Sequence, residues 1–414
     1  MSGHHKDGVR LIRVVLILLV APCFGRATLA DDWPHWRGPH HNGTSAEDLW
    51  RHRWGKDGKP QVVWRASVGT GYSAVAIRED RLYTIGNVDD QDTVYCLHAV
   101  TGETIWTHRY ECPLDNNFFE GGPTSTPTID GSRVYAISRP GDLFCFDASN
   151  GRVIWSHNVA KKTGNRVPGW GFASSPLIHG DLLLLNVGEA GLALDKRSGE
   201  VRWSSADKDA GYATLVVANH KKAPEIIVAS ARFIIAVDLH SGRENWRYRW
   251  LTSFGANAAD PIVVGENVFM SSGYNRGAIL LKETDAEPEV VWENKEMRTQ
   301  MNGCVLVDDH LFGFDGNSDA PTSLKCIEWA TGKVCWADKD VGFGALMAAD
   351  DYLIVLTERG ELLVAPADRA GFKPTGRLSV LDGPCWTVPV LANGRVYCRS
   401  SAGELACVDV QESR

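Results

Sequence analysis

Beyond residue 30 the sequence lacks any apolar run approaching the roughly 18 residues of a membrane-spanning helix. It also lacks Cys-x-x-Cys spacing, so neither a zinc site nor an attached c-type haem has support. Basic residues are in the minority, and a formal net charge of −8 gives no electrostatic basis for binding nucleic acid or anionic lipid. A long apolar stripe at helical period is missing too, and the chain is therefore predicted to be all-β.

Residues 1–30 differ from the rest of the chain. They combine a basic start, the apolar stretch 14–21 and the small-residue segment 27–30, which is typical of a secretory signal peptide. We expect an exported protein of the periplasm or cell envelope, without a membrane span unless the leader is retained as an anchor. Cys23 follows Val20-Ala21-Pro22 rather than a Leu-Ala-Gly type of lipobox, so lipidation is disfavoured.

The most informative feature present is a motif of a small residue, Gly, three variable positions and Trp. Weaker copies end at Trp64 and Trp292, and the seven tryptophans are separated by 42 to 49 residues. This period lies in the range of propeller blades. Because each Trp recurs once per unit, we expect it to dock neighbouring blades. The five clear copies end at Trp106, Trp155, Trp203, Trp246 and Trp336.

Each repeat contains the pattern of one four-stranded blade. Two short apolar strands precede the motif, the Thr-Gly or Asn-Gly pair forms a hairpin, and the Trp strand follows. A further segment upstream often carries Pro, which suits an inner strand because that strand is an edge of the blade. Eight such inner segments are predicted, near Ser73, Thr124, Ser174, Ala213, Ala258, Asn302, Ala345 and Thr387.

The last inner segment has no Trp strand after it, whereas residues 61–66 precede the first. We therefore predict an eight-bladed β-propeller, closed by these N-terminal residues completing the blade of residues 386–410. The predicted division is a signal peptide at 1–30, an N-terminal extension at 31–60 and a single propeller domain at 61–414. Deleting residues 31–50 is expected to be milder than deleting residues 61–66. We expect a monomer.

The cysteines give little support for a bound metal. Four of them stand where sister repeats carry Ala193 and Ala236, which predicts small buried side chains in middle strands. The presence of one or two disulfides remains an open alternative, because connectivity cannot be deduced from spacing. These four are Cys96, Cys145, Cys326 and Cys407.

The Thr-Gly-x-x-x-Trp unit, preceded by an Ala-Leu-Asp-like strand, resembles the PQQ-type propeller repeat of quinoprotein dehydrogenases and BamB, over roughly residues 61–410. The opening Trp33-Pro34-His35-Trp36-Arg37-Gly38-Pro39 is similar to exported PQQ-like proteins of planctomycete-type bacteria. In the dehydrogenases the resemblance implies PQQ held against a disulfide of adjacent cysteines, with calcium and an Asp base. This chain has no Cys-Cys dipeptide, so no cofactor or metal is predicted, and PQQ with calcium belongs to the alternative alone.

The favoured function is a non-enzymatic scaffold that binds an envelope protein or peptide with its loop-bearing face. The alternatives are a quinoprotein-like alcohol dehydrogenase or a small-ligand binder. Loops that lead into the inner strands carry aromatics and glycines, which suits either a ligand-gripping ring or a plug of the channel. The candidate ligand or partner residues are Asn117, Phe118, Glu120, Trp170, Phe172, Tyr212, Phe254, Phe343 and Trp386.

Overall fold

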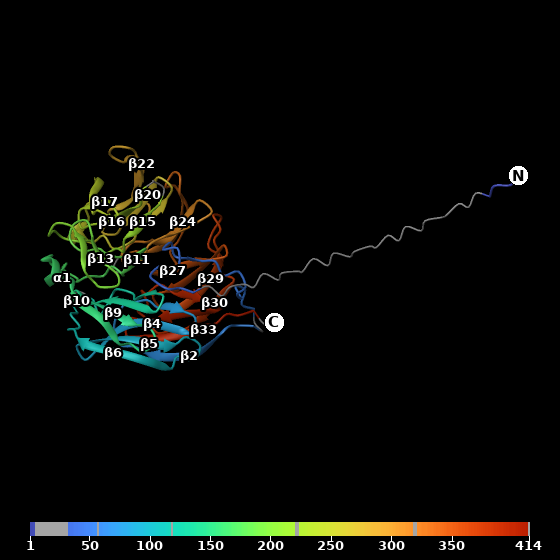
Figure 1. Cartoon of the computed structure of the whole chain (residues 1–414), viewed down its shortest axis with the longest axis horizontal. Coiled ribbons are helices and arrows are strands. Elements are labelled where there is room, and N and C mark those ends of the chain that lie inside the picture. The colour runs from blue at the N-terminus through green and yellow to red at the C-terminus, as the bar shows by residue number, and fades with distance from the viewer. Residues whose placement is uncertain (5–31, 56–57, 117–118, 220–222, 318–320, 413–414) are drawn as a thin grey trace.

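The computed structural model describes residues 1–4, 32–55, 58–116, 119–219, 223–317 and 321–412. It is built from eight sheets, antiparallel apart from one parallel pair, arranged around a central channel, and inner strands of neighbouring sheets contact one another (Figure 1). The predicted eight-bladed all-β propeller is confirmed. The described helices are short: α1 (Val159–Thr163) and the 3-10 turn η1 (Ser253–Gly255). Among the described residues, no helix is long and apolar enough to cross a membrane.

The first four blades follow one order, from the innermost strand outward. Blade 1 is β3 (Ala76–Arg78), β4 (Arg81–Val88), β5 (Gln91–His98) and β6 (Thr104–Glu111). Blade 2 is β7 (Thr128–Asp130), β8 (Arg133–Ile137), β9 (Asp142–Asp147) and β10 (Val153–Asn158). Blade 3 is β11 (Leu177–His179), β12 (Leu182–Leu185), β13 (Leu192–Asp195) and β14 (Val201–Ser204). Blade 4 is β15 (Val216–Ala218), β16 (Glu225–Ala229), β17 (Phe233–Asp238) and β18 (Glu244–Arg249).

The remaining blades repeat this order, and the last two also take strands from the N-terminal part. Blade 5 is β19 (Ile262–Val264), β20 (Asn267–Ser272), β21 (Gly277–Lys282) and β22 (Glu289–Asn294). Blade 6 is β23 (Val305–Val307), β24 (His310–Asp315), β25 (Ser323–Glu328) and β26 (Val334–Asp338). Blade 7 is β27 (Gly344–Ala349), β28 (Tyr352–Thr357), β29 (Glu361–Pro366) and β30 (Gly376–Ser379), with β1 (Thr44–Ser45) beside β27. Blade 8 is β31 (Val390–Ala392), β32 (Arg395–Arg399), β33 (Glu404–Asp409) and β2 (Gln61–Ser67).

Ring closure occurs where the sequence predicts it. Strand β2 pairs antiparallel with β33, with Trp64 opposite Cys407 and Ser67 opposite Glu404. Without β2, strand β33 would present an unpaired edge to solvent. The first and last parts of the propeller are thus joined by backbone hydrogen bonds.

The repeat tryptophans dock neighbouring blades, as predicted. Trp106 Nε1 donates to the carbonyl oxygen of Ala148 in blade 2 at 2.9 Å, and Trp203 Nε1 donates to that of Leu239 in blade 4 at 3.0 Å. A Cβ on Gly242 would lie 2.6 Å from the Trp203 ring, and Gly242 has a φ of +72°. The motif needs Gly for two reasons, because the turn is left-handed and because the indole packs directly on it.

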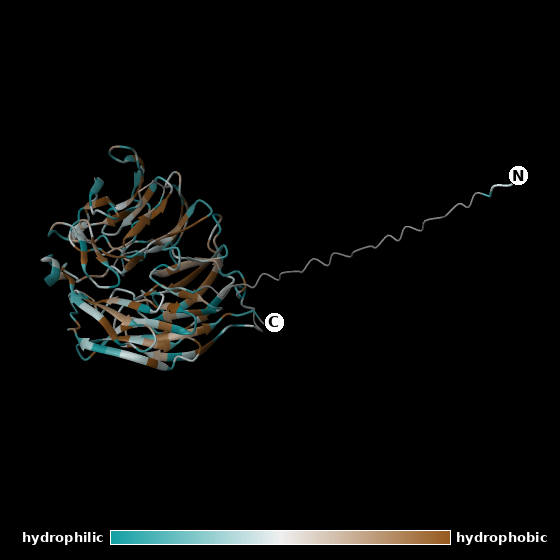
Figure 2. Cartoon of the chain, in the orientation of Figure 1, coloured by the Kyte–Doolittle hydropathy of each residue, from teal (hydrophilic) through white to brown (hydrophobic). Residues whose placement is uncertain are grey.

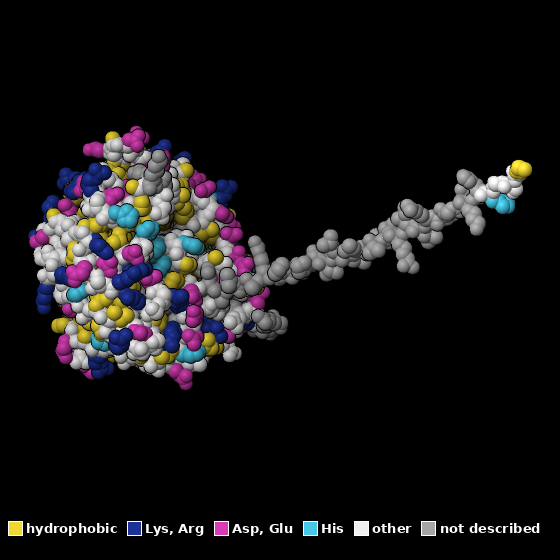
Figure 3. Space-filling model, in the orientation of Figure 1, with side chains coloured by type: hydrophobic (Ala, Val, Ile, Leu, Met, Phe, Trp, Pro, Cys, Tyr) yellow, Lys and Arg dark blue, Asp and Glu magenta, His cyan; other side chains and the backbone are white. Residues whose placement is uncertain are grey.

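The core lies between blades and is mostly apolar, so brown residues run through the middle strands in Figure 2 while outer strands are more mixed. The four middle-strand cysteines named above are fully buried, as expected. All nine described cysteines are free thiols. On the face seen in Figure 3, acidic and basic side chains are interspersed rather than gathered by sign.

The N-terminal extension lies partly inside the ring instead of beside it. The Trp33 backbone bonds Ile77 of β3, the Ile129 amide of β7 donates to Pro34, and β1 runs parallel to β27. Residues 33–45 therefore fill the channel as a loop, called here the channel hairpin. Its Trp33 and Arg37 are buried. The expectation that deleting residues 31–50 is milder than deleting residues 61–66 stays a prediction.

Residues 50–54 of the extension cover the junction of blades 7 and 8. Trp50 is fully buried and forms a bridge with Gln411, while the Trp54 ring packs on Gly376 of β30. The outer strand of blade 7 has no Trp of its own. The extension thus supplies indole rings where the repeat lacks one.

Candidate functional site

A cavity of about 270 Å³ opens at the channel mouth. Its walls come from the segments that lead into the inner strands, which is where the sequence placed a ring of aromatics. Because loops of different blades meet at the same mouth, residues far apart in the chain line it together. Its lining consists of Trp36, Tyr72, Phe119, Thr124, Trp170, Ala173, Tyr212, Thr214, Ala256, Ala258, Asp260, Tyr274, Gln300, Met301, Asn302, Trp386 and Thr387.

The floor of the cavity is formed by the tip of the channel hairpin. Trp36 Nε1 donates to Asp260 Oδ2, and the Thr214 backbone N–H donates to Asp260 Oδ1 at 2.7 Å. Arg37 Nε lies 3.9 Å from Asp260 Oδ2, and Arg37 Nη2 donates to two carbonyl oxygens, those of Asn42 and Cys304. Asp260 thus fixes the hairpin beneath the cavity.

Both charges of this pair are buried, and burial opposes ionisation of each. Burial raises the pKa of the Asp260 carboxyl, although the nearby Arg37 charge, the Trp36 indole and the Thr214 amide all act in the opposite direction. Burial lowers the pKa of Arg37, and Asp260 opposes that shift. An unpaired charge at either position would be costly, so the two residues stabilise each other.

Aromatic rings form the upper walls. Tyr72 and Trp386 stack with ring centroids 5.7 Å apart, and Trp170 meets the edge of Tyr212 at 5.6 Å. Tyr72 donates its hydroxyl to Glu120 at the rim, and burial together with this carboxylate raises the Tyr72 pKa.

Arg139 holds two of the mouth loops together. Its Nε donates to the Trp170 carbonyl oxygen at 3.0 Å, and its Nη2 binds Asp115 Oδ2 at 2.7 Å. The guanidinium also lies over the Phe119 ring, 5.2 Å from the centroid. A buried cation with this many partners fixes the position of Trp170.

Two threonine hydroxyls of the cavity lack a hydrogen-bond partner within the described chain, Thr124 Oγ1 and Thr387 Oγ1. Thr387 is 4% exposed. A buried hydroxyl without a partner costs free energy. Both threonines line the cavity, which makes their hydroxyls candidate partners for a bound molecule.

A groove of about 630 Å³ adjoins the cavity and shares Trp170 and Tyr212 with it. Phe254 borders this groove with 76% of its surface exposed and a φ of +62°. Its ring meets the edges of Trp170 at 6.2 Å and Tyr274 at 5.7 Å. A bulky residue in the left-handed region is strained, so the fold maintains this exposed ring against a local cost.

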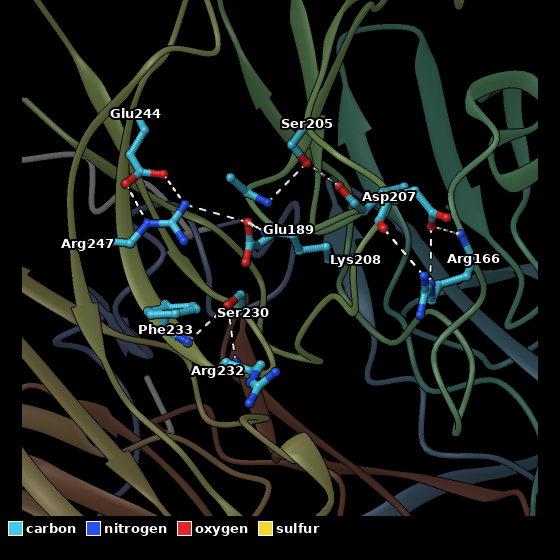
Figure 4. Close-up of polar contacts among 12 residues, drawn as sticks. Arg166, Glu189, Ser205, Asp207, Lys208, Ser230, Arg232, Phe233, Glu244 and Arg247 are labelled. Carbon is cyan, nitrogen blue, oxygen red and sulfur yellow. Dashed lines mark hydrogen bonds and ion pairs between the residues drawn. The ribbon is translucent and has the colours of Figure 1, made fainter.

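Ion pairs stabilise the loops around the groove (Figure 4). Glu189 binds both Lys208 at 3.0 Å and Arg247 at 3.5 Å, and Arg166 binds Asp207 at 3.3 Å. The Arg232 side chain lines the groove and makes no hydrogen bond or ion pair within the described residues. The groove therefore offers one free cation beside its aromatic rings.

The structure places five of the nine predicted site residues at the mouth. Trp170, Tyr212 and Trp386 line the cavity, Phe254 borders the groove, and Glu120 lies at the rim. Their role as ligand or partner contacts stays a prediction. Asn117 and Phe118 lie outside the described residues.

Phe172 and Phe343 do not line the mouth. Phe172 is 2% exposed and packs in the core beside Gly141 of blade 2, and Phe343 is 5% exposed and packs against Phe314. Adjacent loop residues can point in opposite directions, which no periodic rule anticipates. These two side chains support the mouth from below.

Sequence reasoning missed Trp36, Asp260 and Tyr274 as lining residues. Trp36 lies in the predicted N-terminal extension rather than in the predicted propeller domain, and no repeat pattern points to Asp260. The available signal was the composition of residues 33–41, where Trp, His and Arg are too concentrated for a solvated linker.

The cavity does not match the donors implied by the resemblance to quinoprotein dehydrogenases. Its described lining contains no cysteine, lysine or arginine, whereas PQQ is a tricarboxylate that needs cationic partners. The one lining carboxylate, Asp260, already accepts from Trp36 and Thr214. No group of three or more His, Cys, Asp or Glu in the described chain is placed to hold a metal ion.

Solved structures share the fold at low sequence identity. BamB from Moraxella catarrhalis is 16% identical, with a TM-score of 0.60 over 85% of this chain and 99% of that one. Quinohemoprotein alcohol dehydrogenase from Comamonas testosteroni is 12% identical, with a TM-score of 0.67 over 92% of this chain and 81% of its own. A europium-containing methanol dehydrogenase is 10% identical, with a TM-score of 0.69 over 92% and 98%.

No relative among curated proteins matches the sequence. A family model does match, over residues 92–338, and its description is outer membrane protein assembly factor BamB. The match spans more than half of the 414 residues and covers the repeats whose tryptophans dock the blades. The chain is a PQQ-like β-propeller and belongs to the BamB family.

Proposed function

We propose that this protein is a non-enzymatic, exported scaffold that binds a protein or peptide partner with its loop-bearing face. The observation that carries the proposal is Phe254 at the junction of groove and cavity, because its ring is exposed although its backbone is strained. Single exposed apolar residues are common, but here Trp170, Phe254 and Tyr274 make edge contacts in series. Rigid aromatic anchors of this kind dominate the binding energy of protein interfaces.

The charged and apolar residues that line the groove suit the binding of an extended partner segment. Arg232 and Asp209 provide one group of each sign at its edge, and Ala210 and Leu251 provide apolar surface. The family description also names an assembly factor, and such a protein works through contacts with other proteins. A quinoprotein-like oxidoreductase lacks comparable support, because the lining residues do not fit the cofactor.

The test is capture of partners from an envelope extract by the wild-type chain and by Phe254→Asn. Asn tolerates the left-handed conformation, so this variant removes the ring without adding backbone strain. We expect capture of the major partner to fall at least about tenfold, the loss typical of an aromatic anchor.

The matched control is Ile105→Asn, which also removes an exposed apolar side chain but lies on the outer strand β6. This variant should capture the partner normally. Undiminished capture by folded Phe254→Asn, or a loss confined to Ile105→Asn, would refute the proposed face.

A further inference from the structure

The cavity is rich in hydrogen-bond acceptors and aromatic faces but has no cation in its described lining. We propose that it binds a primary alkylammonium group, such as the end of a lysine side chain. This inference rests on the proposed function, because it assigns a chemistry to the same face. It concerns a different pocket from the groove beneath Phe254.

The walls suit a cation because tyrosine and tryptophan present electron-rich faces. Trp36, Trp170, Trp386, Tyr72 and Tyr212 enclose the space from the floor and from several sides. Cations gain most from such faces when they are removed from water, and aromatic cages recognise organic ammonium ions in this way. An ammonium is a compact cation that fits within a cavity of about 270 Å³.

Several polar atoms of the cavity can accept hydrogen bonds. Thr124 Oγ1 and Thr387 Oγ1 have no partner in the described chain. Asn302 directs its Nδ2 to the carbonyl oxygens of Trp386, at 2.8 Å, and Gly344, at 3.5 Å, which leaves its Oδ1 available. An ammonium has three donors that these oxygens can accept, whereas a carboxylate or a phosphate would lie beside the Asp260 carboxylate of the lining.

The nearby cations do not compete for this space. Arg139 is occupied by Asp115 and by backbone carbonyl oxygens, and Arg37 donates to the carbonyl oxygens of Asn42 and Cys304. Arg37 is the only cation beside Asp260 in the described chain, and its Nε at 3.9 Å is beyond hydrogen-bond distance. Asp260 lines the cavity, so its carboxylate can attract a second cation electrostatically, although both of its oxygens already accept hydrogen bonds.

The apolar part of the lining suits an unbranched stem. Ala256, Ala258 and Met301 line the cavity along with the rings. A lysine side chain buries its methylene groups against apolar surface while its head reaches polar atoms. A partner lysine would enter from the open mouth, next to the groove that receives the partner segment.

The experiment compares butylammonium with 1-butanol, which has the same number of heavy atoms and no charge, by calorimetric titration of the full chain. We expect butylammonium to bind at least about tenfold more tightly. Equal affinity, tighter binding of 1-butanol, or no butylammonium binding to the folded protein at millimolar concentration would overturn the proposal.

Variants locate the site. Asp260→Asn should weaken butylammonium binding about tenfold, whereas Asp48→Asn, an exposed position with the same loss of charge, should not change it. Since Asp260 also fixes the channel hairpin, Thr387→Val provides a second test that keeps side-chain shape. It should weaken binding about threefold by removing one acceptor. Unchanged affinity in both folded cavity variants would overturn the assignment.

Two further arms separate a partner lysine from a free amine. A peptide carrying lysine should bind more tightly than the same peptide with Nε-acetyl-lysine, and captured partner should be displaced by butylammonium. If butylammonium binds the protein but does not displace the captured partner, the ligand is a free amine and not a partner lysine. If butylammonium fails to bind while Phe254→Asn still abolishes capture, this inference falls and the proposed function stands.

Discussion

Among the fifteen tryptophans of this chain, Trp203 and Trp170 have different surroundings and different expected roles. Trp203 is almost buried, packs on Gly242 of the next blade and donates to a backbone carbonyl there. Trp170 is half-buried, contacts Tyr212 and Phe254 by ring edges, and faces the cavity. The first arrangement stabilises the ring, and the second leaves a ring face available to a ligand.

We therefore expect Trp203→Ala to lower the free energy of unfolding by about 3–5 kcal/mol, as for truncation of a buried Trp. Trp170→Ala should cost markedly less, because part of its ring contacts solvent rather than protein. Urea denaturation of both variants gives the comparison. Equal destabilisation would mean that Trp170 is a channel plug and not a binding residue.

Single residues at the mouth were predictable only in part. The loop sequence indicated that aromatics would gather there, and Trp170, Tyr212 and Trp386 do line one cavity. It gave no direction for each side chain, so Phe172, which follows Trp170 by two positions, was placed at the mouth although it lies in the core. The irregular backbone of the loops sets the direction of each side chain, and it has no periodicity from which that direction could be predicted.

At the scale of elements, the channel hairpin is the part whose position the sequence did not predict. Residues 33–45 contain no alternation and no helical stripe, so periodicity arguments give them no position. Their partners belong to blades 1, 2, 5, 6 and 7, and these contacts exist only once the ring has formed. By contrast, β2 continues the repeat pattern and could be assigned to blade 8 from the Trp64 register.

The hairpin contains a partly buried histidine pair that makes it sensitive to acid. His35 and His41 stack with centroids 3.8 Å apart, and burial lowers the pKa of His35 to about 4 and that of His41 to about 3. The neighbouring His40 and Arg37 charges lower the His41 pKa further. Below the usual histidine pKa of 6.5, these two imidazoles therefore take up protons in the unfolded chain but stay neutral in the folded protein.

Because the folded pKa values are depressed, this contribution to stability is present above pH 6.5 and is lost as the pH falls toward 4. Each imidazole contributes a slope of at most about 1.4 kcal/mol per pH unit. We expect His35→Gln with His41→Gln to flatten the decline in unfolding free energy between pH 6.5 and 4.5. His240→Gln, at an exposed position, is the control and should leave the slope unchanged. An unaltered slope in the double variant would contradict the partly buried, neutral pair.

For the whole molecule, the sequence carried the architecture because its repeat is also its unit of packing. The spacing of Trp64, Trp106, Trp155 and their counterparts corresponds to one blade each, and blade closure followed from the orphan strand. The occupied channel could not be predicted, since the plug comes from outside the repeats. The channel hairpin forms the floor of the cavity, which would otherwise open into the channel.

The central claim is that a partner binds on the loop-bearing face, and site-specific photo-crosslinking tests it most directly. A photoreactive residue at position 254 should give a covalent adduct with an envelope protein. The same residue at position 309, in the exposed turn between β23 and β24 at the opposite face, should give none. Adducts from position 309 alone, or a bound partner that never crosslinks to position 254, would contradict the account.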